Sequence, residues 1–170
     1  MIKILRIILY PVSLLYGLLM HLRNWCFDKK LFYAFKPKVK TIVVGNLSTG
    51  GTGKTPHIEY LIRLLENDFK IASLSRGYGR KTTGFKVATL TDNALTIGDE
   101  PAQYYQKFMD IIVAVDAKRR RGIKKLLAQF PSLSVILLDD AFQHRSVKAG
   151  LQILLTDYAN MYYDDRMLPT

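Results

Sequence analysis

A glycine-rich segment that ends in a lysine and a threonine offers the clearest chemistry in this sequence. It runs from Thr41 to Thr55 (TIVVGNLSTGGTGKT) and holds three glycines between Gly50 and Gly53. These glycines let the backbone turn back and present N–H groups to phosphate oxygens without a Cβ in the way. Lys54 is then placed to reach the β- and γ-phosphates of a nucleotide, and the Thr55 hydroxyl is placed to ligate Mg²⁺.

The elements on either side of this segment fit the same chemistry. The β-branched run from Thr41 to Val44 predicts a strand, and apolar residues at helical spacing predict a helix from about Thr55 to Asn67. Strand, glycine turn, Lys-Thr and helix in this order make a P-loop, whose helix N-terminus adds free N–H donors. Ser48 stands where the strict pattern has its first glycine, so the loop departs from that pattern at one position.

A second candidate segment supplies carboxylates. Four apolar residues from Val135 to Leu138 lead into Asp139 and Asp140, and a polar turn continues to Arg145. An apolar strand that ends in aspartate is typical of a Walker-B strand, whose acidic end meets Mg²⁺ beside the P-loop. Such strands are common, so this pattern indicates a Walker-B strand mainly because it occurs together with the predicted P-loop.

Two further segments have the composition of site loops. Ser75 to Lys81 (SRGYGRK) is a basic, glycine-containing loop after a predicted strand, which suits a second anionic group or a solvated turn. Gly98 to Pro101 (GDEP) precedes a predicted helix that includes residues 102–108. Asp99 and Glu100 there either do chemistry or simply place negative charge at a helix N-terminus.

The remaining pattern predicts how these segments come together. Further strands are expected at Ile71–Ser75, Ile111–Val115 and Leu151–Leu155, with a short strand or hairpin arm within Phe85–Leu90. Strands that alternate with helices predict an α/β fold with a doubly wound, mainly parallel sheet. Ligands of such folds bind at the carboxyl ends of the strands, where the P-loop, Arg76 to Arg80, Asp99, Asp116 and Asp139 would converge.

The composition of the chain limits the kinds of partner that it is expected to bind. The 170 residues fit one domain, and the formal net charge of +11 favours anionic partners such as nucleotides or phospholipid headgroups. The basic run from Lys118 to Arg121 predicts a solvated or membrane-facing helix surface. Nucleic acid is not expected, because no aromatic interleaving or nucleic-acid module accompanies the charge. Cys26 is the only cysteine, which excludes an intrachain disulfide and a cysteine-based metal cluster.

The N-terminus differs from the rest of the chain. Residues 7–20 carry no charged side chain, and basic residues are denser after this run than before it. The run is shorter than the roughly 20 residues of a full membrane span. A spanning or half-inserted anchor helix therefore competes with a buried or partner-facing soluble helix and with a cleaved signal peptide. We expect a membrane-anchoring helix in residues 1–30 and a P-loop kinase domain in residues 31–170, on the cytoplasmic side.

Four motifs in order carry a resemblance to a known family. The segments VGNLSTGGTGKTP (Val44 to Pro56), SRGYGRK, GDEP and DDAFQHR (Asp139 to Arg145) follow a hydrophobic basic N-terminus. The set resembles tetraacyldisaccharide 4′-kinase, the lipid A kinase of Gram-negative bacteria. The resemblance implies ATP- and Mg²⁺-dependent phosphorylation of the 4′-hydroxyl of an acylated glucosamine disaccharide 1-phosphate at the cytoplasmic face of the inner membrane.

The resemblance also implies roles for individual residues. Asp99 would be the base that takes the hydroxyl proton, with Lys54 and His144 as further catalytic residues. Mg²⁺ would be held by Thr55, Asp139 and Asp140. ATP would be bound by the loop residues and one arginine: Gly50, Gly51, Thr52, Gly53, Lys54, Thr55 and Arg76.

Two points leave alternatives open. Members of that family are roughly twice this long, so we expect a chain truncated at its C-terminus that binds nucleotide without necessarily turning over. One competing function is a membrane-surface or nucleic-acid binding module that works through its charge. The other is a membrane-associated nucleotide switch or partitioning-type P-loop ATPase. That class needs a lysine directly before the two glycines, and Thr49 is there instead.

Overall fold

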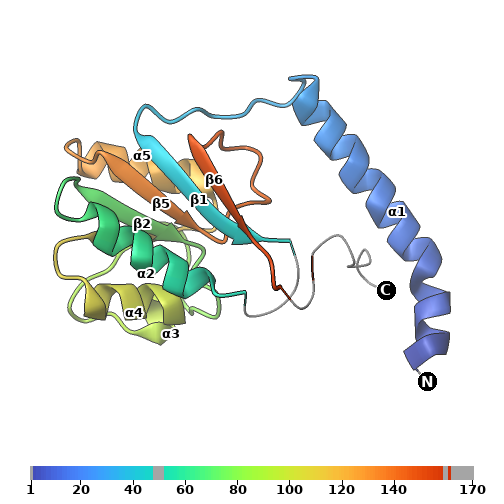
Figure 1. The fold of residues 1–170 in the computed structure, drawn as a ribbon, viewed down its shortest axis with the longest axis horizontal. Coiled ribbons are helices and arrows are strands. Elements are labelled where there is room, and N and C mark those ends of the chain that lie inside the picture. The colour runs from blue at the N-terminus through green and yellow to red at the C-terminus, as the bar shows by residue number, and fades with distance from the viewer. Residues whose placement is uncertain (1, 48–51, 159–160, 162–170) are drawn as a thin grey trace. The chain divides into compact units, whose positions relative to one another are not determined.

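The computed structural model describes residues 2–47, 52–158 and 161, with side chains described from Tyr10 onward (Figure 1). Strands and helices alternate along most of the chain, as expected for an α/β fold. The elements in chain order are α1 (Ile2–Asp28), β1 (Lys40–Asn46), α2 (Lys54–Leu65), β2 (Ile71–Ser75), β3 (Lys86–Val87), α3 (Ala94–Ile97), α4 (Asp99–Lys107), β4 (Ile112–Val115), α5 (Arg119–Gln129), β5 (Val135–Asp139) and β6 (Leu151–Leu155).

The strands form one sheet in the order β3-β4-β2-β5-β1-β6. All neighbours are parallel except β3, which pairs antiparallel with β4 at one edge. In the centre of the sheet Val44 of β1 is in register with Asp139 of β5. The prediction of a mainly parallel, doubly wound sheet is therefore confirmed, and the P-loop strand and the acidic strand are direct neighbours.

Two apolar layers cover the faces of the sheet. Ile58 and Ile62 of α2 pack with Tyr104 of α4 on one face. On the other face, Ile123 and Leu126 of α5 pack against β-strand residues of the same sheet. Figure 1 shows α2 and α4 side by side on one face and α5 on the opposite face. Because both faces are covered, the central strands β2 and β5 are buried along their whole length, which explains their continuous apolar runs.

The sequence predicted most elements closely and a few less so. The strands at Ile71–Ser75 and Leu151–Leu155 have the predicted bounds. The arm expected within residues 85–90 is only the two-residue β3, and α3 was not expected. Helix α4 begins at Asp99, so Asp99 and Glu100 belong to its first turn while Gly98 is its N-cap.

The chain divides into two units, one formed by Phe35–Thr156 and the other by Met1–Ala34 with Asp157–Thr170. The first unit contains the sheet. In the second unit α1 is a helix of 27 residues with Pro11 inside it and several exposed apolar side chains, among them Leu14, Leu15 and Leu18. Within the described residues, no helix combines the length and the apolar character needed to cross a membrane. The anchoring role of α1 and the division at residue 30 stay predictions.

Candidate functional site

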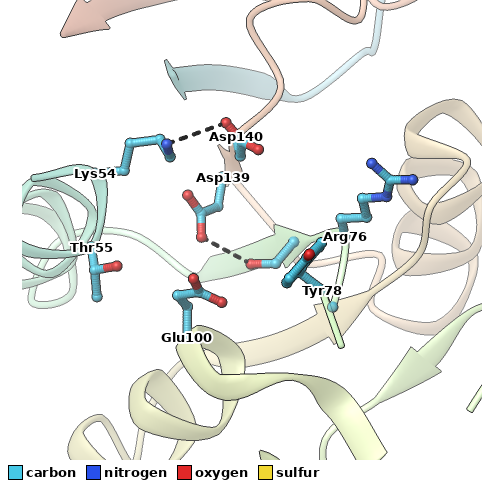
Figure 2. Close-up of a pocket in the computed structure, with 9 residues that line it drawn as sticks. Lys54, Thr55, Arg76, Tyr78, Glu100, Asp139 and Asp140 are labelled. Atoms are coloured by element: carbon cyan, nitrogen blue, oxygen red, sulfur yellow. Dashed lines mark hydrogen bonds and ion pairs between the residues drawn. The ribbon is translucent and has the colours of Figure 1, made fainter. Parts of the chain in front are cut away.

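A pocket opens at the carboxyl ends of β2 and β5, beside the N-terminus of α2 (Figure 2). Its cavity volume is about 170 Å³. Cationic and anionic side chains share it, which is the composition expected for binding a phosphate together with a metal ion. Nine residues line it: Lys54, Thr55, Ser75, Arg76, Gly77, Tyr78, Glu100, Asp139 and Asp140.

Two partners hold Lys54 in the pocket, one at the end of β1 and one directly after β5. Its ammonium donates to Asn46 Oδ1 at 2.9 Å, and Asn46 is buried at the end of β1. The same ammonium lies 3.6 Å from Asp140 Oδ1, the ion pair drawn in Figure 2. The lysine that follows the glycine turn is thus already directed toward the acidic end of β5.

Asp139 is the buried carboxylate of the pocket, only 5% exposed. Its Oδ2 accepts hydrogen bonds from the Tyr104 hydroxyl at 3.1 Å and from Ser75 Oγ at 3.3 Å. Burial, with smaller contributions from the negative charges of Glu100 and Asp140, raises the pKa of Asp139 to about 6, and the hydrogen bond from Tyr104 opposes this shift. The Asp139 carboxylate is therefore protonated more readily than an ordinary aspartate.

The next residue, Asp140, has an unusual backbone conformation. Its φ is +49°, in the left-handed region that side chains other than glycine rarely adopt. The side chain is 61% exposed and forms the ion pair with Lys54. Aspartate tolerates this region better than most residues. The turn therefore directs two successive carboxylates differently, Asp139 inward and Asp140 toward the mouth of the pocket.

A buried arginine supports this end of the sheet. Arg119 is 2% exposed and donates from Nη1 to the Asp116 carbonyl at 2.6 Å and from Nη2 to the Asp139 carbonyl at 3.0 Å. Burial lowers its pKa to about 10, and the charges of Asp139 and Asp140 oppose that shift. Arg119 therefore stays charged at neutral pH and joins the ends of β4 and β5.

Two glycines bring the 75–81 loop against the start of α4. A Cβ on Gly98 would lie 2.9 Å from Gly77 Cα, and a Cβ on Gly77 would lie 2.7 Å from the Ile97 carbonyl oxygen. Both residues also have positive φ, +69° for Gly77 and +97° for Gly98. Only glycine fits this approach, and it places Arg76 and Tyr78 on the same pocket as Glu100.

The oxygen donors of the pocket fit a hard divalent cation. Thr55 contributes a hydroxyl, and Asp139 and Asp140 contribute carboxylates. Within the described part of the chain, no three His, Cys, Asp or Glu side chains form a complete metal cluster. Mg²⁺ commonly binds through one or two carboxylates while substrate phosphates and water complete its shell, so this residue set suits Mg²⁺ held jointly with a nucleotide.

The start of α2 is suited to the phosphates themselves. Its N-cap, Gly53, has a φ of +79°, and no described side chain caps the helix. The N–H groups and positive dipole end of the first turn are therefore available to an anion. Next to this turn, the Thr52 hydroxyl is buried without a hydrogen-bond partner among the described residues. A bound phosphate would give these donors an acceptor.

Five of the predicted site residues come together, and others lie apart. Lys54, Thr55, Arg76, Asp139 and Asp140 line the pocket, with Thr52 and Gly53 next to it in the chain. Asp99 is exposed in the first turn of α4 and His144 lies in the turn after β5, and neither is among the lining residues. Gly50 and Gly51 lie outside the described residues.

Other expected residues have structural partners. Asp116 is fully buried and accepts two hydrogen bonds from Arg121, at 2.8 and 2.7 Å. Arg80 of the basic loop donates to the Gly84 carbonyl at 2.6 Å. Of the cations expected in that loop, Arg76 is the one that lines the pocket.

The sequence pattern did not single out several pocket residues. Glu100 was considered together with Asp99 but was assigned no site role, and Tyr78 was noted only as part of the basic loop. Tyr104, Ser75 and Arg119 contact Asp139 from positions 20 to 64 residues away in the chain. One signal was available for Arg119, since it follows Asp116 at the end of a predicted strand, but nothing local distinguishes it from its basic neighbours.

The profile of a family described as tetraacyldisaccharide-1-P 4′-kinase matches residues 5–170. A tetraacyldisaccharide 4′-kinase of Flavobacterium johnsoniae is 57% identical over 99% of this chain and 49% of its own length, and one of Bacteroides fragilis is 54% identical over 95% and 43%. The chain thus spans about half the length of the curated relatives it matches.

A solved structure agrees with the fold. The chain resembles the crystal structure described as LpxK from Aquifex aeolicus in complex with ATP, with a TM-score of 0.87 and 37% identity. The match covers 97% of this chain and 52% of that one. The sheet, the P-loop strand and the acidic strand therefore have the arrangement of a solved relative.

Proposed function

Since this chain belongs to the tetraacyldisaccharide 4′-kinase family, we propose that it forms the nucleotide-binding part of an enzyme that transfers the γ-phosphate of ATP to a lipid disaccharide. The acceptor is the 4′-hydroxyl of an acylated glucosamine disaccharide 1-phosphate, the substrate that the family resemblance implies. The product would be a precursor of lipid A.

The observation that carries this proposal is the meeting of Lys54 with the acidic end of β5. The two segments are more than 80 residues apart in the chain, yet Lys54 Nζ lies 3.6 Å from Asp140 Oδ1 beside the buried Asp139. A phosphate-binding lysine and metal-binding carboxylates at this separation are what phosphoryl transfer requires. The ATP complex of the Aquifex aeolicus relative supports ATP as the phosphate donor.

The residues of the chain then have distinct roles. The first turn of α2 and Lys54 bind the β- and γ-phosphates, and Arg76 lies across the pocket as a further cation. Thr55, Asp139 and Asp140 would hold Mg²⁺, which supplies charge neutralisation at the phosphate oxygens. Asp99, at the start of α4, takes the proton from the acceptor hydroxyl as the hydroxyl oxygen attacks the γ-phosphorus, and the bond from that phosphorus to ADP breaks, so that ADP leaves. Catalysis here depends mostly on positioning and electrostatics.

The acceptor's chemistry also bears on location. A lipid disaccharide is held at a membrane surface, and α1 exposes Leu14, Leu15, Leu18, Leu19 and Leu22. We propose that α1 lies in the interface of the inner membrane on its cytoplasmic face, with the basic residues after it near anionic headgroups. The net charge of +11 supports attraction to such a surface.

A two-part assay tests the proposal. ATP binding is measured by titration on the 170-residue chain, and phosphate transfer to an acylated disaccharide 1-phosphate is measured on a version extended to the length of its relatives. Lys54→Ala should weaken ATP binding and reduce transfer by at least about 100-fold. Leu90→Ala, at an exposed side chain that does not line the pocket, is the control. An extended enzyme that is indifferent to ATP would contradict the proposal.

A further inference from the structure

A row of polar contacts joins α2 to α4 along the face that the two helices share. Thr55, Glu59 and Arg63 are spaced four residues apart and so lie on one stripe of α2. Thr55 also lies near Tyr104 of α4, where its side chain opposes the rise that burial gives the pKa of the Tyr104 hydroxyl. One turn further, Glu59 Oε1 accepts from Gln103 Nε2 at 2.6 Å and from Lys107 Nζ at 2.7 Å.

The third contact in the row closes the far end. The Arg63 guanidinium lies 5.2 Å from the centre of the Phe108 ring and also 3.4 Å from Glu59 Oε2. Glu59 contacts positions 103 and 107 and Arg63 contacts the C-cap at 108, so the two helices run in the same direction. Figure 1 shows them next to one another on one face of the sheet.

Glu59 is the centre of this row and is unusual for a helix-surface carboxylate. Its side chain is only 8% exposed, while those of Lys107 and Arg63 are 46% and 56% exposed. Burial alone would raise its pKa, but the hydrogen bonds from Lys107 and Gln103 outweigh burial and hold the pKa below its ordinary value. A buried, charged carboxylate fixes its partners in one geometry more strictly than an apolar contact would.

The register of the row relates it to the pocket. Glu59 lies one helical turn after Thr55, and Gln103 lies one turn after Asp99 and three residues after Glu100. The Glu59–Gln103 contact therefore lies about one helical turn from the N-terminus of α2, which borders the pocket, and from the N-terminus of α4, which carries Asp99 and Glu100. Among the described helices, α2 begins at the phosphate-binding turn and α4 begins within the GDEP segment, so contacts between these two helices relate the two turns directly.

From these contacts we propose that Glu59 is a positioning residue, which sets the separation between the phosphate-binding end of α2 and the acidic start of α4. Glu59 itself is not among the residues that line the pocket. It acts by fixing α4, and with it Asp99 and Glu100, relative to Lys54 and Thr55. This assignment of a catalytic effect rests on the proposed kinase function, whereas the helix separation itself does not.

A distance measurement tests the structural part without any activity. Spin labels are placed on cysteines introduced at Tyr60 of α2 and Gln106 of α4, both exposed, in a Cys26→Ser background. The unaltered pair should give one narrow distance distribution by pulsed electron resonance. Glu59→Ala should broaden or shift it, and Gln103→Ala, which removes one hydrogen bond at an exposed side chain, should do so to a smaller extent. An unchanged distribution in Glu59→Ala would overturn the proposal.

Kinetics test the functional part on the extended enzyme. Glu59→Ala should lower kcat about 10- to 100-fold while the ATP dissociation constant changes by no more than about twofold, because displaced catalytic groups cost turnover rather than phosphate binding. The charge swap Glu59→Lys with Lys107→Glu should restore most of the lost turnover. Glu66→Gln, a carboxylate-to-amide change at the end of the same helix, is the matched control and should leave kcat unchanged.

The outcomes separate the two proposals. If Glu59→Ala loses stability but retains kcat, or if the charge swap gives no recovery, Glu59 has only a structural role and the positioning proposal is wrong. If the unaltered extended enzyme transfers no phosphate to the disaccharide, the proposed function is wrong, and the distance measurement still decides whether Glu59 sets the helix separation.

Discussion

Gly98 and Gly77 approach so closely that neither position has room for a side chain. A Cβ on Gly98 would meet Gly77 Cα at 2.9 Å and the Tyr78 carbonyl oxygen at 3.0 Å. This approach joins the loop after β2 to the first turn of α4, two segments that are about 20 residues apart in the chain. The pocket owes its wall of Arg76, Tyr78 and Glu100 to it.

The first prediction concerns this approach. Gly98→Ala should lower the free energy of unfolding by about 2–4 kcal/mol, because it adds a steric clash to the strain of a positive φ. Gly79→Ala is the control. Gly79 also has a positive φ (+73°), but an alanine methyl there would have no atom within 4 Å, so only the strain of about 1–2 kcal/mol should appear. Urea unfolding of both variants measures the difference, and equal losses would contradict the steric explanation.

The second prediction separates the two neighbouring acids of α4. Asp99→Ala should reduce phosphate transfer by the extended enzyme about 10²- to 10⁴-fold while ATP affinity stays within about twofold, as expected for a group that acts on the acceptor proton. Glu100→Ala should instead change nucleotide and Mg²⁺ affinity, because Glu100 lines the pocket. Initial rates and ATP titrations distinguish them. Normal turnover in Asp99→Ala would remove its assigned role.

The third prediction follows from the pKa of Asp139, which burial raises to about 6. Between about pH 4 and 6 the folded protein binds a proton at Asp139 that the unfolded chain has released, so Asp139 contributes less stability as pH rises through this window. In metal-free buffer, Asp139→Asn should therefore gain up to about 3 kcal/mol relative to the unaltered protein between pH 4 and pH 8. It should also lose Mg²⁺-dependent nucleotide binding.

Urea unfolding at several pH values measures this effect. Asparagine retains an oxygen that accepts the Tyr104 and Ser75 hydrogen bonds, so the comparison isolates the charge. Asp110→Asn, at an exposed carboxyl, is the control. A stability difference that does not grow between pH 4 and pH 8 would show that the charge of Asp139 does not destabilise the fold.

The fourth prediction tests the proposed interfacial role of α1. Replacing Leu14, Leu15 and Leu18 by serine should reduce binding to anionic phospholipid vesicles by at least about tenfold, because each buried leucine contributes roughly 1.5–3 kcal/mol. Leu90→Ser, at a side chain that is 91% exposed, is the control. Sedimentation at low and high salt separates the apolar from the ionic contribution. Unchanged binding of the triple variant would locate any membrane contact elsewhere.

Much of the fold followed from local pattern. Runs such as Ile71–Ser75 and Val135–Leu138 are apolar because both faces of the sheet are covered. Their alternation with predicted helices was enough to predict a mainly parallel sheet. The P-loop residues and the Asp139–Asp140 pair were recognisable because phosphate and metal chemistry requires particular side chains at short, fixed spacings. The four motifs in sequence also predicted the family, which the comparisons confirm.

The residues that complete the pocket were decided only by tertiary structure. Tyr104, Ser75 and Arg119 reach Asp139 from three other elements, and Glu59 meets Gln103 across 44 residues of chain. No local periodicity encodes such contacts, because they depend on strand order and helix packing rather than on spacing within one element. The sequence by itself identified the phosphate-binding and metal-binding residue types and their spacing. The packing of α4 and α5 against the sheet determined which further side chains, such as Tyr104 and Arg119, contact Asp139.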